Sequence, residues 1–162
     1  MNNMTKKKNA MRSFSPHLNV VIDTNILLGN ITLLEYLFDC YYASKLFSIC
    51  VPWGVLLELE GLLKSKHRVT RARAYRANYW INMELKKYSD SVIFQTIEED
   101  LEFKNISQNI DDRIFLSTSQ LKENGENVIL LTDDVNLQNK AIIHDIHCCG
   151  SNSIIQNIPV YI

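Results

Sequence analysis

Short apolar segments rich in β-forming residues alternate with longer segments of helical periodicity along this 162-residue chain. The expected strands are residues 18–22, 46–51, 92–96, 128–132 and 146–149. The segments between them are long enough to hold helices. This alternation predicts a three-layer α/β/α sandwich with a central, mostly parallel, five-stranded sheet.

The chain has the length of one domain, which we expect to span residues 17–162 behind a flexible basic tail at residues 1–16. The tail has no apolar core and does not form a signal peptide, and no apolar run is long enough for membrane insertion. The net charge of -1 excludes a uniformly basic nucleic-acid protein. The four cysteines form no C-x-x-C pair, which favours reduced thiols in an intracellular protein of the nucleus or cytoplasm.

Acidic residues follow two of the expected strands directly. The strand at residues 18–22 is followed by Asp23, and the segment "VILLTDDVNL" places Thr132, Asp133 and Asp134 between another strand and a helix that opens near Asn136. In parallel α/β sheets, sites lie outside the carboxyl ends of the strands, where the strand order reverses. We therefore expect these carboxylates at one edge of the sheet.

Two expected helices add further acids. Glu58 and Glu60 lie about 200° apart on one helix, so only one of them can face the site, and periodicity does not choose between them. In the "NIDDRIFL" segment, Asp111 lies closer to the apolar face of its helix than Asp112 does. Asp111 is therefore the better candidate to face the interior.

A cluster of carboxylates needs neutralisation. Two of them 4 Å apart repel by about 4 kcal/mol at an effective dielectric constant near 20. Oxygen ligands without histidine or cysteine favour Mg²⁺ or Mn²⁺ over zinc. Such ions can activate water and stabilise the leaving oxygen of a phosphodiester, so hydrolysis of a nucleic-acid backbone is the expected reaction.

The segments "VVIDTNILL", "LELEGL", "NIDDRIFL" and "LLTDDVNL", in this order, resemble the four signature segments of the PIN domain, a ribonuclease family of RNA processing and decay. The resemblance covers about residues 19–150. Within the family, it is greatest to eukaryotic RNA-surveillance endonucleases, in particular the nuclear messenger-RNA quality-control endonuclease of yeast type.

The resemblance implies that Asp23, Glu58, Asp111 and Asp134 are the catalytic acids. Asp23, Asp111 and Asp134 would bind Mg²⁺ or Mn²⁺, and Glu58 would complete the site and orient the nucleophilic water. The implied accessory residues are Thr24, Asn25, Asp112, Thr132 and Asp133.

Simpler roles compete with these assignments. Asp23 alone could cap the helix that follows it, and the expected role of Asp133 is to cap the helix near Asn136. Glu60 and Asp112 are expected to be solvated surface acids. The acidic run at residues 98–102 is expected to form a surface turn.

A segment without acidic residues, from 61 to 83, combines basic and aromatic side chains around a helix expected to start at Thr70. It is either a solvated helix face or a path for single-stranded RNA, with Trp80 among the interleaved aromatic residues. We expect Tyr75, Tyr79 and Met83, spaced by four, to contact the core. The candidate RNA-binding residues are Lys64, Lys66, Arg68, Arg71, Arg73 and Arg76.

The sequence thus predicts a metal-dependent endonuclease of single-stranded RNA that leaves a 5′-phosphate and a 3′-hydroxyl, as the resemblance implies. The alternative is a catalytically weak or inactive PIN module that binds RNA or protein as a scaffold. A phosphoacceptor receiver domain is disfavoured, because paired acids follow the fourth expected strand rather than the first.

Overall fold

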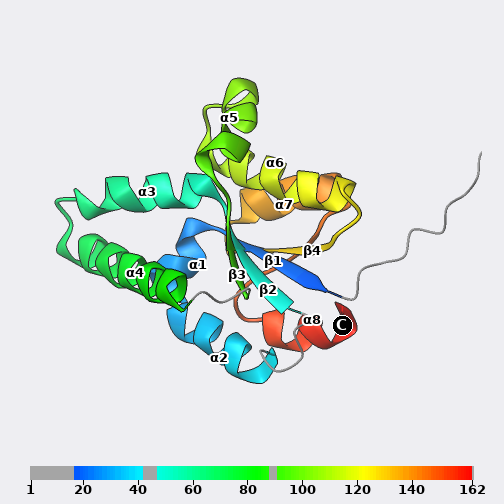
Figure 1. Cartoon of the computed structure of the whole chain (residues 1–162), viewed down its shortest axis with the longest axis horizontal. Helices are drawn as coiled ribbons and strands as arrows, with labels where there is room; N and C mark the ends of the chain where they lie inside the picture. Colours follow the sequence, from blue (N-terminus) through cyan, green and yellow to red (C-terminus); the bar gives the residue numbers. More distant parts are fainter. Residues whose placement is uncertain (1–16, 42–46, 88–90, 162) are drawn as a thin grey trace, which may run out of the picture.

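A computed structural model of the chain describes residues 17–41, 47–87 and 91–161, so the expected tail at residues 1–16 lies outside the described residues. Its centre is one five-stranded sheet in the order β3-β2-β1-β4-β5, in which all neighbouring strands pair in parallel. This confirms the expected fold class (Figure 1). The strands are β1 (Leu18–Ile22), β2 (Phe47–Val51), β3 (Val92–Phe94), β4 (Asn127–Leu131) and β5 (His147–Cys149).

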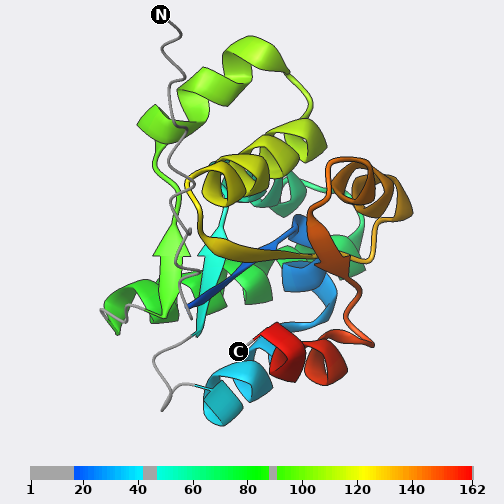
Figure 2. The same ribbon diagram turned by 90° about the vertical axis from the view of Figure 1, so that its right-hand side faces the viewer.

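Helices cover both faces of this sheet. In Figure 2, α5, α6 and α7 lie on one side of it, and α2 and α8 lie on the other. Helix α3 packs against α4 and against α6. The helices are α1 (Thr24–Gly29), α2 (Ile31–Tyr41), α3 (Trp53–Leu63), α4 (Arg68–Lys86), α5 (Ile97–Ile106), α6 (Ile110–Glu123), α7 (Val135–Ile143) and α8 (Ile154–Tyr161). In the described part of the chain, none of them is both long and apolar enough to cross a membrane.

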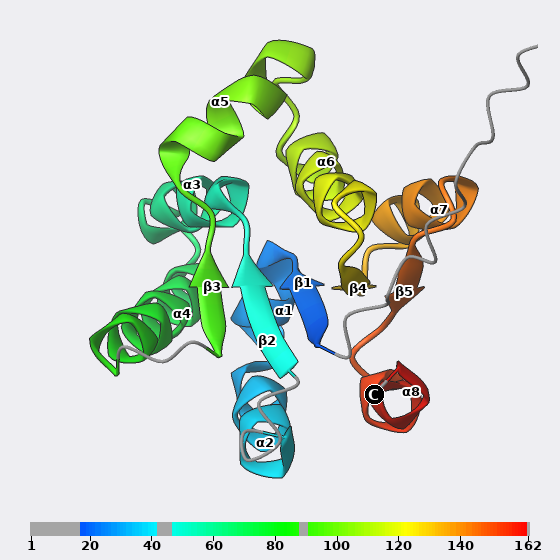
Figure 3. The same cartoon turned by 45° about the vertical axis from the view of Figure 1, so that its right-hand side comes forward.

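The central strand β1 fixes the position of the candidate site. All five of its residues are buried, as expected for a strand covered on both faces. Strands β2 and β3 follow on one side of β1, and β4 and β5 follow on the other, so the strand order reverses between β1 and β4 (Figure 3). The register pairs Ile22 with Leu131, which brings the residues just after these strands side by side. Asp23 and Thr132 therefore meet at the switch point of the sheet.

The core-facing side of α4 differs from the expectation. Tyr75, Tyr79 and Met83 are 61%, 68% and 37% exposed, so the prediction that they contact the core was wrong. The buried face of α4 instead consists of Ala74, Ala77, Trp80, Ile81 and Glu84. Its small alanines let the helix approach its neighbours, and the bulk comes from Trp80, whose ring stacks on Phe38 of α2 at a centroid distance of 6.2 Å. The stripe of large residues four apart therefore faces outward.

The acidic run at residues 98–102 lies in the first turns of α5 and not in a surface turn. Thr96 and Glu99 form a capping box at its start, where acidic residues also favour the helix dipole. Asp100 is buried, 2% exposed, and pairs through both carboxylate oxygens with the buried Arg113 of α6. This pair fixes α5 against α6, the helix that carries Asp111.

Candidate active site

Asp23 lies between the end of β1 and the start of α1, and it is only 3% exposed. One carboxylate oxygen, Oδ1, accepts a hydrogen bond from the backbone N–H of Ile26 at 2.9 Å, so Asp23 does cap α1. The other, Oδ2, accepts a hydrogen bond from the hydroxyl of Thr132. Burial, together with the smaller effect of the negative charges of Asp133 and Asp134, raises the pKa of Asp23 to about 6, although the two hydrogen bonds lower it. The charged form of Asp23 is therefore held in an unfavourable environment.

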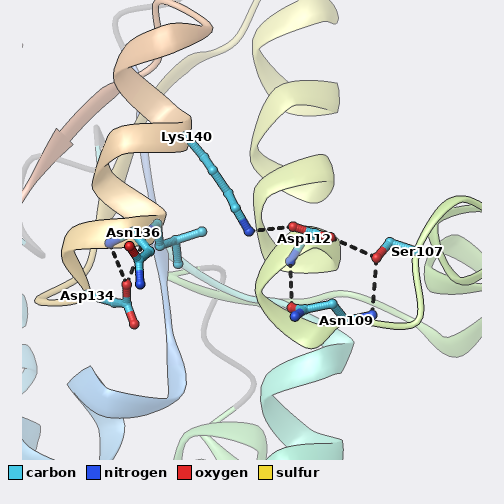
Figure 4. A network of polar contacts seen from close by, with 7 residues as sticks. Ser107, Asn109, Asp112, Asp134, Asn136 and Lys140 are labelled. Atoms are coloured by element: carbon cyan, nitrogen blue, oxygen red, sulfur yellow. Dashed lines mark hydrogen bonds and ion pairs between the residues drawn. The ribbon is translucent and has the colours of Figure 1, made fainter.

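Thr132 connects the two acidic strand ends. Its buried hydroxyl donates to Asp23 and accepts a hydrogen bond from the backbone N–H of Asp134 at 3.0 Å. The side chain of Asp134 caps α7, where Oδ1 accepts from the N–H of Asn136 at 2.7 Å and of Leu137 at 3.0 Å (Figure 4). Within the described residues, Oδ2 of Asp134 has no hydrogen-bond partner and is available for a ligand.

Asp133 does not cap this helix, so that prediction was wrong. Helix α7 begins at Val135, which makes Asp134 the residue in the N-cap position. The carboxylate of Asp133 instead accepts hydrogen bonds from the backbone N–H and the hydroxyl of Ser151, at 2.7 and 2.8 Å. Gly150 permits this approach, because a Cβ atom there would lie 2.9 Å from Oδ1 of Asp133. Asp133 is thus tied to the segment after β5.

The neighbouring acids of α6 have different environments. Partial burial raises the pKa of Asp111, and the charge of Asp134 raises it further, while the charge of Lys140 opposes this shift. Asp112 accepts hydrogen bonds from the ammonium group of Lys140 and, at 2.8 Å, from the hydroxyl of Ser107 (Figure 4). These contacts, with Lys140 first, lower the pKa of Asp112. Asp112 is therefore neutralised by an ion pair between α6 and α7. Asp111 is subject to the charge of Asp134 and has no such ion pair with the residues that the structure describes.

The structure distinguishes the two glutamates of α3. Oε2 of Glu58 accepts a hydrogen bond at 2.6 Å from the hydroxyl of Thr24, the buried residue that follows Asp23. Glu60 is exposed and pairs with Lys64 along the helix surface, as expected for a solvated acid. Asn25, the other expected polar neighbour of Asp23, is exposed. Glu58 is thus the glutamate that faces the site.

These contacts connect the four expected acids in a chain, not in a closed group. Glu58 is joined to Thr24, Asp23 is joined through Thr132 to Asp134, and Asp134 acts electrostatically on Asp111. Over the ranges that the structure describes, no three acidic, histidine or cysteine side chains are already arranged to hold a metal ion. The donors are nevertheless all oxygens, and burial and neighbouring negative charges raise the pKa values of Asp23 and Asp111, effects that a bound cation would oppose.

The expected basic residues lie around the turn between α3 and α4, at the left of Figure 1. Arg71 donates a hydrogen bond to the carbonyl oxygen of Ser65 at 2.8 Å and thereby closes this turn. Lys64 is engaged with Glu60, and Arg76 makes a long contact of 3.4 Å to the hydroxyl of Thr32. The exposed members of the set are Lys64, Lys66, Arg68, Arg73 and Arg76.

Lys140 was missed by the sequence reasoning. It lies 28 residues after Asp112 in the chain and in a separate helix, and no local pattern links the two residues. Only the packing of α6 against α7 brings its ammonium group to the acids.

Comparison with known proteins agrees with the observed fold. Residues 20–152 match the PIN domain family. The structure of the PIN domain of human SMG5 superposes with a TM-score of 0.55 at 15% identity, over 86% of this chain and 98% of that one. A domain of a functionally unknown protein from Methanocaldococcus jannaschii superposes with the same TM-score of 0.55 at 21% identity. This match covers 82% of this chain and 89% of that one. At these identities, both structures support the fold alone.

A relative of higher identity is the human protein named Transcriptional protein SWT1, with 32% identity over 131 residues. The match covers 76% of this chain but only 14% of the length of the human protein. Because the family match extends over most of the described residues, the chain belongs to the PIN domain family.

Proposed function

We propose that this chain is a metal-dependent endonuclease of single-stranded RNA. The observation that supports this most is the buried Asp23, which is joined through Thr132 to the strand end that carries Asp134. A protein gains little stability from a buried carboxylate with a raised pKa beside two other acids. A site for a divalent cation accounts for its presence.

Asp23, Asp111 and Asp134 would hold Mg²⁺ or Mn²⁺. Asp134 offers Oδ2 directly, and each oxygen of Asp23 keeps a further lone pair beyond its hydrogen bond. When bound, the ion supplies an activated water and neutralises charge on the phosphodiester.

Glu58 would orient the attacking water, since Thr24 holds its carboxylate next to Asp23. Hydrolysis of this kind leaves a 5′-phosphate and a 3′-hydroxyl. Lys140 would keep Asp112 out of the metal site by pairing with it. The two adjacent acids of α6 thus have separate roles.

The basic residues at the α3–α4 turn would bind the RNA backbone. Lys64 follows Glu58 by six residues on α3, which corresponds to about 9 Å along a helix axis. A flexible single strand can span this distance. The name of the human relative connects that protein with transcription. For this chain, the proposed role is RNA quality control or decay in the nucleus, the cytoplasm or both.

A cleavage assay on an unstructured RNA, with Mn²⁺ and with EDTA, tests the proposal. Asp134→Asn is the most informative variant, because asparagine caps a helix as well as aspartate does but carries no charge. We expect cleavage to fall at least 100-fold while the melting temperature stays nearly unchanged. Asp145→Asn is the matched control, because Asp145 is exposed and has a φ of 56°, which asparagine also adopts. Undiminished Mn²⁺-dependent cleavage by Asp134→Asn would contradict the assigned role.

A second candidate function is that of a non-catalytic PIN scaffold. It is favoured because, among the described side chains, no three acidic, histidine or cysteine residues are already arranged to bind a metal ion. The two functions differ in metal binding. A cation that binds only the folded state raises its stability by RT ln(1 + [L]/Kd), about 2.7 kcal/mol at a hundredfold excess over Kd. A scaffold would show no Mn²⁺-dependent rise in melting temperature, yet would still bind RNA or a protein partner.

A further inference from the structure

A cavity of about 350 Å³ lies between α2 and α4. Its volume falls in the range of ligand sites, about 300–1,000 Å³. Helix α2 contributes Ile31 and Glu35 to its wall, and α4 contributes Arg76, Tyr79, Trp80 and Met83. None of the acids assigned to metal binding lines it.

We propose that this cavity binds one unpaired nucleobase of the RNA substrate, an inference that rests on the proposed function. Trp80, Met83 and Tyr79 provide flat or apolar walls, and single-stranded nucleic acids bind by stacking their bases on such aromatic side chains. Tyr79 is 68% exposed, so its ring is accessible to a base in the cavity. A base stacked here would cover its ring.

The polar side chain on the α2 wall of the cavity also matches a base. The exposed carboxylate of Glu35 can accept a hydrogen bond from an N–H group of a nucleobase. An aliphatic side chain of a protein partner offers no such donor.

Some charged side chains at the edge of the cavity are already paired, whereas another can contact a ligand. Glu84 is buried and pairs with Lys87 at 2.6 Å, so these two charges neutralise each other. Arg76 is exposed, and among the described residues its side chain has only the 3.4 Å contact with Thr32, which leaves its guanidinium for a phosphate. Arg76 follows Arg68 by eight residues, about 12 Å along α4, so it continues the basic surface of the α3–α4 turn to the cavity. The RNA would run along α4 and place one base between α4 and α2.

The intrinsic fluorescence of Trp80 reports occupancy directly. The chain has two tryptophans, and Trp53→Phe removes the other signal. In this background, a six-nucleotide unstructured RNA is titrated in EDTA, which prevents cleavage. We expect the RNA to quench Trp80 and Tyr79→Ala to weaken its affinity at least fivefold. The matched control is Tyr75→Ala, one turn earlier on α4, because Tyr75 is equally exposed but does not line the cavity.

Arg76→Met should reduce the slope of log K against log salt by about one, the effect of one lost phosphate contact. An abasic hexamer of the same length should bind without quenching Trp80. If Trp53→Phe perturbs folding, hydrogen exchange of α2 and α4 in the unmodified protein replaces fluorescence, and protection of both helices by RNA is then expected.

Two results would overturn the inference and leave the proposed function standing. In one, RNA binds and is cut with Mn²⁺ but neither quenches Trp80 nor protects α2 and α4. In the other, Tyr79→Ala and Tyr75→Ala weaken binding equally. If no RNA binds, with or without Mn²⁺, both this inference and the proposed RNA substrate fail.

Discussion

Replacing Lys140 by methionine should strengthen the binding of Mn²⁺. The ammonium group of Lys140 pairs with Asp112 and acts on the adjacent Asp111, so it repels any cation that binds there. Methionine keeps the length and apolar stem of the side chain but removes this charge. The site then becomes more negative by one unit.

The size of the effect follows from Coulomb's law. A divalent ion on Asp111 and the ammonium group on Asp112 would be separated by about 8 Å, which at the dielectric constant of water gives about 1 kcal/mol of repulsion. The dielectric constant of water is appropriate because the side chains of Lys140 and Asp112 are 40% and 39% exposed. Removing 1 kcal/mol of repulsion strengthens binding about sixfold at low ionic strength. At 0.15 M salt, screening should reduce this gain to about twofold.

The cost in stability should be small, because half-exposed ion pairs contribute about 0.2–1 kcal/mol. Isothermal titration with Mn²⁺ in 20 mM and 150 mM salt measures the affinities, and thermal melting without metal measures the cost. Lys64→Met is the matched control: Lys64 also pairs with an acid, Glu60, but on the exposed surface of α3. If Lys140→Met binds Mn²⁺ no more tightly than the wild type, the cation does not bind beside Asp111.

Three further predictions concern stability without metal. The folded-state pKa of Asp23, about 6, is above its ordinary value of 3.8, so between these pH values the folded protein binds more protons than the unfolded chain. The free energy of unfolding should therefore fall by up to about 3 kcal/mol as the pH rises from 4 to 7. Asp23→Asn should remove most of this pH dependence, as measured by thermal melts across the same range. Gly150→Ala should cost about 1 kcal/mol in urea unfolding, because its Cβ displaces the carboxylate of Asp133, and an unchanged midpoint would contradict this. Arg113→Met should lower the free energy of unfolding by about 3–5 kcal/mol, because it leaves Asp100 buried, charged and without its ion-pair partner. Adding Asp100→Leu should restore much of this stability in the same assay. If the double variant is as unstable as Arg113→Met, the unpaired charge is not the cause.

The order of strands and helices could be predicted from the sequence because it depends on local apolar periodicity. The acids at the ends of β1 and β4 could be predicted for the same reason, since a buried parallel strand must end at the edge of the sheet. For Asp111, helical periodicity already favoured the residue that the structure places beside Asp134.

The remaining details depend on contacts between distant segments. Glu58 and Glu60 both flank the apolar face of α3, and they are distinguished by contacts that the sequence does not show: Glu58 accepts from the hydroxyl of Thr24, whereas Glu60 pairs with Lys64 on the surface. Tyr75, Tyr79 and Met83 of α4 have the spacing of residues that face a core, although they face outward. The spacing alone therefore could not show which face of the helix is buried. The choice between Asp133 and Asp134 as the helix cap depended on one residue, the start of α7 at Val135. Element boundaries are uncertain by more than that in any sequence.

The hydrogen bond between Thr132 and Asp23 has a consequence for protein synthesis. Its partners are 109 residues apart, and they meet only when β4 has paired with β1. A growing polypeptide on the ribosome therefore cannot assemble this centre until nearly all of the domain has emerged. Any activity that depends on this centre, including the proposed cleavage of RNA, can therefore begin only after β4 has been synthesised.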